Sequence, residues 1–187
     1  HITGDAQAKT NAIRMVNYLS GNLHVTGTAG FIARYWADQA TGIYQGDAWC
    51  DDPAQSRCHH IETGPFADKW WWGETSRDMY NGWFFGMCVA YDLIDDPTMR
   101  NTIRTDVADV LTVLMAQNWT ILNEIGELTD SAPEVMAPFR YAWLIIGYHI
   151  TGDAAIKADL QRMLLDSNRT TLQLTSINIM NRYTQYF

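Results

Sequence analysis

The chain has 187 residues, of which 47% are hydrophobic and 18% are charged, and its formal net charge is −8. This length and composition support one buried core and argue against a disordered chain. The thirteen basic residues are scattered, so binding to nucleic acid or to an anionic membrane is not expected. The longest apolar run, residues 141–150, is about half of the roughly 18 residues that a membrane helix needs, so we expect a buried helix there.

In the first part of the chain, helical periodicity recurs and strand patterns are nearly absent. Apolar positions from Ile13 to Leu23 predict a first helix that ends near Gly27. Thr28 is the expected N-cap of a second helix, whose apolar stripe begins at residues 31–35. The long apolar helix expected over residues 75–94 comes next.

In the second half, Asp96 as N-cap and Pro97 at the first helical position predict the start of a further helix. Two more helices are expected over residues 133–148 and 153–165. The segment His1–Ala6 recurs as His149–Ala154, and both copies combine a helix-ending Gly with a helix-capping Asp, which is typical of αα-hairpins. We therefore predict an all-α chain of stacked αα-hairpins, one α-hairpin domain over residues 1–187. Because His1 matches a helix end, this domain is expected to be part of a longer chain or assembly.

Two segments resemble those of a family of secreted bacterial (α/α) toroid proteins. The first is residues 24–34, HVTGTAGFIAR, and the second is residues 72–86, WGETSRDMYNGWFFG, followed by AYDLIDD at residues 90–96. The family carries "vTGxpGxxAR", "GdxSxDqyxGxxfG" and "ayDlxdD" in this order, and Met79 departs from its usual Gln. The resemblance implies a partial or half (α/α) toroid. Its relatives in fold include glycoside hydrolases and polysaccharide lyases, whose sites lie in the central cleft.

The segment from Lys69 to Tyr80 contains the richest set of chemical groups. If a helix starts near Thr75, Glu74 and Asp78 lie on one side of its first turn, where the helix dipole favours ionised carboxylates. Indole rings stack on sugar faces, and a guanidinium binds a carboxylate through two hydrogen bonds. The predicted catalytic residues are Asp78, Glu74 and Arg77, with Asp78 first because the family keeps an Asp there. The predicted substrate-binding residues are Trp70, Trp71, Trp72, Tyr80 and Trp83.

Other interpretations of this segment stay open. Glu74 and Asp78 are also suited to capping a helix, and a glycosidase needs a second carboxyl, for which Glu127 and Asp130 are the candidates. In a lyase, His59 or His60 would abstract the proton beside a uronate carboxylate, with Tyr80 as acid and Arg77 binding the carboxylate.

The cysteines favour an oxidising compartment. Cys50 and Cys58 share a polar loop and are predicted to form a disulfide, and Cys88 is predicted to be a free buried thiol. A metal site in the loop of residues 47–60 is the weaker alternative, because no second Cys pair exists. No phosphate-binding loop, nucleophile elbow or zinc-protease motif occurs, and no metal or cofactor is expected.

The sequence thus leads to two hypotheses about function. One is a secreted or periplasmic carbohydrate-processing domain, of the glycoside hydrolase or polysaccharide lyase type, that binds a saccharide. The other is a non-catalytic binding or assembly module of helical repeats. In both, a further chain segment or a homo-oligomer is expected to complete the toroid and cover its open apolar surface.

Overall fold

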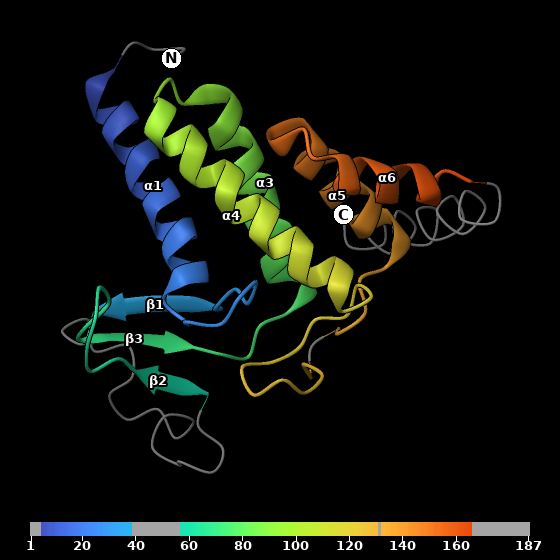
Figure 1. The fold of residues 1–187 in the computed structure, drawn as a ribbon. Coiled ribbons are helices and arrows are strands. Elements are labelled where there is room, and N and C mark those ends of the chain that lie inside the picture. The colour runs from blue at the N-terminus through green and yellow to red at the C-terminus, as the bar shows by residue number, and fades with distance from the viewer. Residues whose placement is uncertain (1–4, 39–56, 131, 166–187) are drawn as a thin grey trace, which may run out of the picture.

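The computed structural model describes residues 5–38, 57–130 and 132–165, and this part of the chain forms five helices and a three-stranded sheet (Figure 1). The all-α prediction, with its stacked hairpins in a partial or half (α/α) toroid, is therefore wrong, because a sheet lies at one end of the helices. In chain order the elements are α1 (Ala6–His24), β1 (Tyr35–Asp38), β2 (Cys58–His60), β3 (Lys69–Trp72), α3 (Arg77–Leu93), α4 (Pro97–Ala116), α5 (Ala137–Thr151) and α6 (Ala154–Met163).

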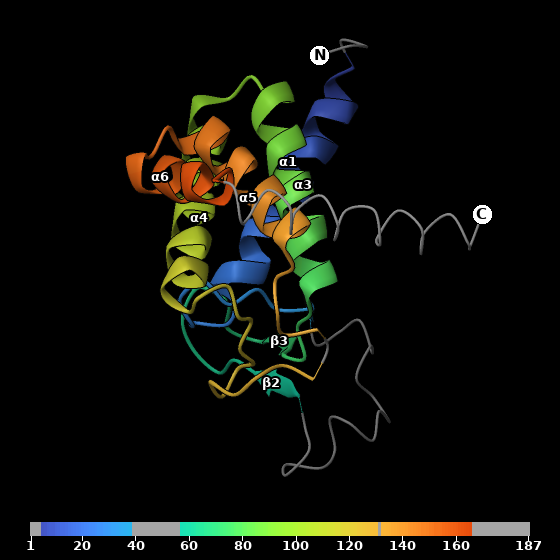
Figure 2. The ribbon, with the colours of Figure 1, turned by 90° about the vertical axis from the view of Figure 1, so that its right-hand side faces the viewer.

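The helices form two groups around one core. Helices α1, α3 and α4 pack against one another, and the α5–α6 hairpin packs against α3 and α4 through α5 (Figures 1 and 2). None of the described helices combines the length and the apolar character that crossing a bilayer requires. The largest fully buried side chains of the core include Trp83, Phe84, Met87, Ile103, Leu111, Leu114, Trp143 and Leu144.

Three aspartates start helices, as the sequence predicts. Asp96 caps α4 and is followed by Pro97, while Asp5 and Asp153 cap α1 and α6 by accepting hydrogen bonds from two backbone N–H groups each. Gly152 ends α5 with a φ of 68°, a conformation that glycine adopts without steric cost. The repeated Gly-Asp pattern is therefore confirmed as helix-capping chemistry at Asp5 and Asp153.

The sheet replaces the second helix that was expected after Thr28. Its order is β1-β3-β2, and both pairings are antiparallel. In β3, Trp71 lies opposite Trp36 of β1 and His59 of β2, so these three side chains share one face, while the neighbours of Trp71 point to the other. The strands are only three or four residues long, too short for a period-two pattern to be read from the sequence.

A second, smaller core joins the sheet to the end of α1. It contains Val25, Phe31, Ala33 and Trp71, all buried. Trp36 stacks on Tyr18 of α1 with ring centroids 5.4 Å apart, and its Nε1 donates to the Tyr18 carbonyl at 3.1 Å. Aromatic packing of this kind offsets the low intrinsic stability of a small sheet. It also fixes the end of β3, where the chain turns into α3.

Candidate active site

Four segments meet where β3 passes into α3, at residues 73–76. The Gly73 N–H donates to the Arg57 carbonyl at 2.7 Å, and the Thr129 hydroxyl donates to the Thr75 carbonyl at 2.6 Å. Arg34 donates through its Nε to the Glu74 carbonyl at 2.8 Å. The segment is thus tied to the ends of β1 and β2 and to the long connection of residues 117–136, which lies at the same end of the molecule as the sheet (Figures 1 and 2).

Glu74 lies in this junction with its side chain 17% exposed. Its carboxylate forms an ion pair with Arg57, and the same guanidinium contacts Asp130 at 2.7 Å. Burial raises the pKa of Glu74 above its ordinary value, and the negative charges of Asp130 and Glu124 add to the rise, while Arg57 opposes it. Burial outweighs the ion pair, so Glu74 holds a proton more readily than an exposed glutamate does.

Glu124 is the second carboxyl of the site. It comes from the connection of residues 117–136, and its carboxyl group packs so closely on Gly73 that a Cβ atom there would collide with it. Only 7% of its side chain is exposed, and its Oε1 lies 3.5 Å from His59 Nε2. Burial raises the pKa of Glu124, but the interaction with His59 and the charge of Arg57 outweigh this effect, and the net shift is downward.

The two glutamates therefore lie close enough for the charge of Glu124 to act on Glu74, and their pKa values are shifted in opposite directions. Pairs of this kind can divide acid and base roles between them. Within the part of the chain that the structure describes, Glu124 Oε2 is buried and has no hydrogen-bond partner, while His59 contacts the other oxygen, Oε1. Buried polar atoms without partners are rare in native proteins, and at a pair of carboxyls they indicate a place for a ligand or water.

The predicted catalytic residues of α3 lie apart from this pair. The helix begins at Arg77, so Glu74 precedes it and does not share its first turn with Asp78. Asp78 is exposed. Arg77 turns toward the start of α5, where its guanidinium lies 5.0 Å from the ring centre of Phe139 and donates to the Glu134 carbonyl at 3.3 Å.

Tyr80 and Trp83 contact the protein interior. Tyr80 is 3% exposed, and its hydroxyl donates to the Gly30 carbonyl at 3.0 Å and accepts from the Ile32 N–H at 3.4 Å. Burial raises the pKa of Tyr80, so the phenol stays neutral. Trp83 is 2% exposed and donates to the Leu19 carbonyl at 2.8 Å. Both side chains have the contacts of structural residues.

The three tryptophans of β3 divide between the two faces of the sheet. Trp71 is buried and stacks on His59 with ring centroids 4.1 Å apart. Trp70 and Trp72 lie on the opposite face and are half-buried, and Trp70 stacks on His60 at 4.7 Å. Of the three, only Trp70 and Trp72 retain exposed surface against which a sugar ring could stack.

The cysteine predictions are resolved in part. Cys58 lies in β2, but Cys50 lies outside the described residues, so the disulfide stays a prediction. Cys88 is a free thiol that is half-buried rather than fully buried, and burial, followed by the charge of Asp92, raises its pKa. Among the described residues, no group of three or more His, Cys, Asp or Glu side chains could hold a metal ion. Much of the loop of residues 47–60 falls outside that description.

Sequence reasoning did not identify Glu124 or Arg57 as site residues. It named Glu127 and Asp130 as candidates for the second carboxyl. Glu127 is exposed, and Asp130 reaches the site through Arg57. The sequence does contain a signal next to Glu124, because Asn123 is a turn-forming residue. In the structure its side chain accepts hydrogen bonds from the backbone N–H groups two and four residues further on and makes this segment a compact turn.

Comparison of the chain with protein-family models, curated proteins and solved structures finds no match. The resemblance to secreted toroid proteins therefore stays a prediction. What the site can do follows from the geometry of its own residues.

Proposed function

We propose that this chain is a carbohydrate-processing domain that hydrolyses a glycosidic bond, with Glu74 as the acid and Glu124 as the base or nucleophile. The observation that carries the proposal is a pair of neighbouring carboxyls at the β3–α3 junction, both influenced by Arg57, one with a raised and one with a lowered pKa. Glycosidases use such a pair, protonated on one side and ionised on the other. This assignment keeps Glu74 from the sequence prediction and replaces Asp78 with Glu124.

The proposed reaction divides between the two side chains. Glu74 donates its proton to the glycosidic oxygen as the bond to the anomeric carbon breaks. The Glu124 carboxylate either attacks that carbon or removes a proton from the attacking water. His59, 3.5 Å from Glu124, helps to keep that carboxylate ionised.

Elimination from a uronate is the less favoured reaction at this site. A lyase needs a cation to bind the uronate carboxylate, and Arg57 already contacts both Glu74 and Asp130. Arg34 is engaged with the backbone of Glu74. Hydrolysis of a neutral glycan therefore suits the charges of the site better. A secreted or periplasmic location fits this activity and is part of the proposal.

The test compares three single variants on a panel of neutral and uronic oligosaccharides. We expect Glu74→Gln and Glu124→Gln each to lower the release of reducing ends by about 100-fold or more, the size of an acid–base contribution. Asp78→Asn is the matched control, since it removes one carboxylate from an exposed position on α3, apart from the two glutamates, and should leave turnover unchanged. Circular dichroism melting checks that all three variants fold.

Two outcomes would overturn the proposal. One is that Asp78→Asn abolishes turnover while Glu124→Gln does not. The other is that the wild-type chain neither cleaves nor binds any member of the panel. Release of unsaturated uronate, detected by its ultraviolet absorbance, would show that the chain catalyses elimination rather than hydrolysis.

A second candidate, a self-assembly module, is supported by the outer face of α3. Phe85, Val89 and Leu93 recur every fourth residue and are 67%, 40% and 49% exposed. The opposite face of α3 is buried in the core, so the helix carries a second, exposed apolar stripe, which is typical of a surface that contacts another protein. Sedimentation equilibrium of the wild-type chain and of Phe85→Ser tests this candidate. A wild-type chain that stays monomeric at all concentrations would exclude it.

A further inference from the structure

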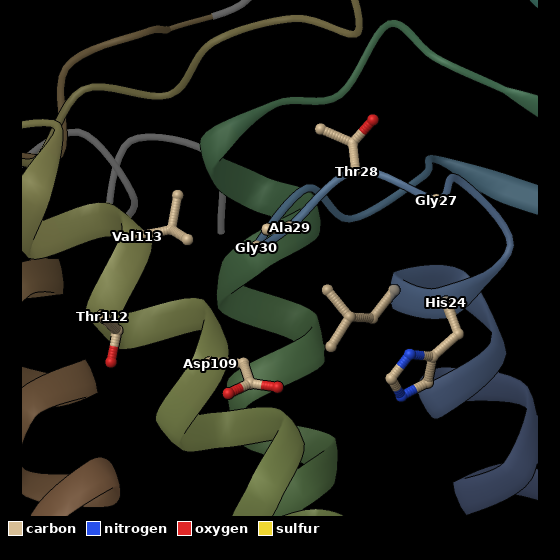
Figure 3. Close-up of a pocket in the computed structure, with 9 residues that line it drawn as sticks. His24, Gly27, Thr28, Ala29, Gly30, Asp109, Thr112 and Val113 are labelled. Atoms are coloured by element: carbon tan, nitrogen blue, oxygen red, sulfur yellow. The ribbon is translucent and has the colours of Figure 1, made fainter.

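A cavity of about 520 Å³ opens between the C-terminal end of α1 and the C-terminal half of α4 (Figure 3). Its volume lies in the range of about 300–1,000 Å³ that small-molecule sites occupy. The floor and walls include apolar surface from Leu23, Ala29 and Val113. His24 enters from α1 and Asp109 from α4, so two polar groups come from opposite walls (Figure 3).

The third wall of the cavity is the loop of residues 27–30, and its conformation is held from three sides. The Thr26 hydroxyl donates to the Leu23 carbonyl at 3.0 Å and accepts from the Thr28 N–H at 3.1 Å. Gly30 has a φ of 67°, and a Cβ there would lie 2.5 Å from Val113, so the loop backbone packs directly on α4. Tyr80 holds the Gly30 carbonyl from α3. The cavity is therefore preformed.

His24 is oriented by a buried carboxylate. Its Nε2 lies 2.9 Å from Asp106 Oδ1, and Asp106 is 1% exposed. The other oxygen, Asp106 Oδ2, is buried without a hydrogen-bond partner among the described residues. A ring nitrogen bound in this way fixes the orientation of the imidazole. The ring therefore forms a fixed part of the cavity wall.

The charges around the cavity select among ligands. Asp109 and the buried Asp106 contribute negative charge, and the C-terminal end of α1 adds the negative end of its dipole. No Lys or Arg lines the cavity in the described part of the chain. An anionic sugar such as a uronate is disfavoured here, while the hydroxyl groups of an uncharged sugar can donate to Asp109.

The cavity adjoins a smaller one that is lined by one member of the carboxyl pair, Glu124. It shares Thr28, Ala29, Gly30 and Val113 with a smaller cavity of about 80 Å³, and Glu124 lines that smaller cavity. The two cavities therefore lie next to each other at the loop of residues 27–30, with Asp109 lining the larger and Glu124 lining the smaller. A chain-like ligand suits this arrangement better than a single small molecule does.

We propose that the cavity between α1 and α4 is a subsite for uncharged sugar units of the glycan that Glu74 and Glu124 cleave, a proposal that rests on the proposed function. A neutral oligosaccharide spans both sites, with one unit against Asp109 and His24 and its scissile bond beside Glu124. The cavity thereby favours neutral chains longer than a disaccharide over shorter ones.

The test measures binding and turnover separately. Calorimetric titration of the Glu124→Gln protein with neutral hexasaccharides of glucose, xylose, mannose and N-acetylglucosamine, and with hexagalacturonate, identifies the ligand. We expect one neutral chain to bind and Asp109→Ala to weaken it by about tenfold or more, since hydrogen bonds to a charged group contribute about 1.5–3 kcal/mol. Asp95→Ala, at the exposed turn before α4, is the matched control and should leave binding unchanged.

Turnover by the chain with native Glu124 distinguishes the two proposals. Asp109→Ala should lower kcat/KM for the hexasaccharide and leave disaccharide hydrolysis unaltered. If hexasaccharide turnover needs both glutamates but is indifferent to Asp109→Ala, the subsite is refuted and the proposed function stands. If a neutral chain binds in an Asp109-dependent way and is never cleaved, the cavity is a sugar site and the catalytic assignment is refuted. Binding of hexagalacturonate alone would overturn the subsite.

Discussion

Replacing Tyr80 with Phe tests whether this phenol is structural or catalytic. Tyr80 is 3% exposed, and its hydroxyl donates to the Gly30 carbonyl at 3.0 Å and accepts from the Ile32 N–H at 3.4 Å. Losing the hydroxyl leaves a buried carbonyl without a partner, which costs about 1–3 kcal/mol, and the longer bond adds little. We expect the free energy of unfolding to fall by about 2 kcal/mol. In a chain of this size that corresponds to a decrease in Tm of roughly 4–8 °C.

The measurement is urea unfolding followed by tryptophan fluorescence, with Tyr141→Phe as the matched control. Tyr141 is half-buried, and its hydroxyl has no hydrogen bond to any described residue, so its removal should change stability by less than about 0.5 kcal/mol. Retention of full stability by Tyr80→Phe together with loss of glycan turnover would refute the structural role and indicate that Tyr80 acts as an acid in the reaction. Loss of stability with little change in disaccharide hydrolysis is the expected result.

Three further predictions concern the junction and the α5–α6 hairpin. Gly73→Ala should lower turnover, because the added methyl displaces the Glu124 carboxyl, and its cost in stability should lie at the low end of the roughly 1–3 kcal/mol of overpacking, because that carboxyl is the end of a flexible side chain. Unchanged turnover by this variant would show that the position of the Glu124 carboxyl does not matter for the reaction. For Glu74, whose pKa is raised, stability should fall as pH rises above about 4.5, and for Glu124, whose pKa is lowered, stability should be lost as pH falls below about 4.5. Melting curves across this range should therefore change in opposite directions in the two Gln variants, and parallel changes would contradict the assigned shifts. Asp159→Ala should lower the free energy of unfolding by about 3–5 kcal/mol in chemical denaturation, because it leaves the Arg140 guanidinium beside the core without its ion-pair partner. A loss below about 1 kcal/mol would show that the ion pair makes no net contribution to stability.

Helix positions and caps could be predicted because their signals are local. Asp96-Pro97 and Gly152-Asp153 act through backbone N–H groups two or three residues away, and these contacts form wherever the segment is helical. The predicted helix over residues 75–94 differs from α3 by two residues at its start and one at its end. That shift is small on the scale of a helix, but it removes Glu74 from the first turn and separates it from Asp78.

The sheet could not be predicted, because its stability depends on pairings between distant segments. The three tryptophans of β3 carry no alternation by themselves, and their extended conformation depends on β1, more than thirty residues earlier in the register. The same residues in isolation are equally compatible with a loop. Packing of Trp36 on Tyr18 then fixes the sheet against α1.

The sequence by itself determined most of the helical segments, the Asp caps of three of them and one member of the carboxyl pair, Glu74. Only the tertiary structure decided which other carboxyl lies near Glu74. Glu124 lies fifty residues further along, and it reaches the site because Gly73 has no side chain to exclude its carboxyl group. Burial then raises the pKa of Glu74, and contact with His59 helps to lower that of Glu124. A pKa shift depends on the charges and solvent around a group, and these exist only after distant segments have packed together.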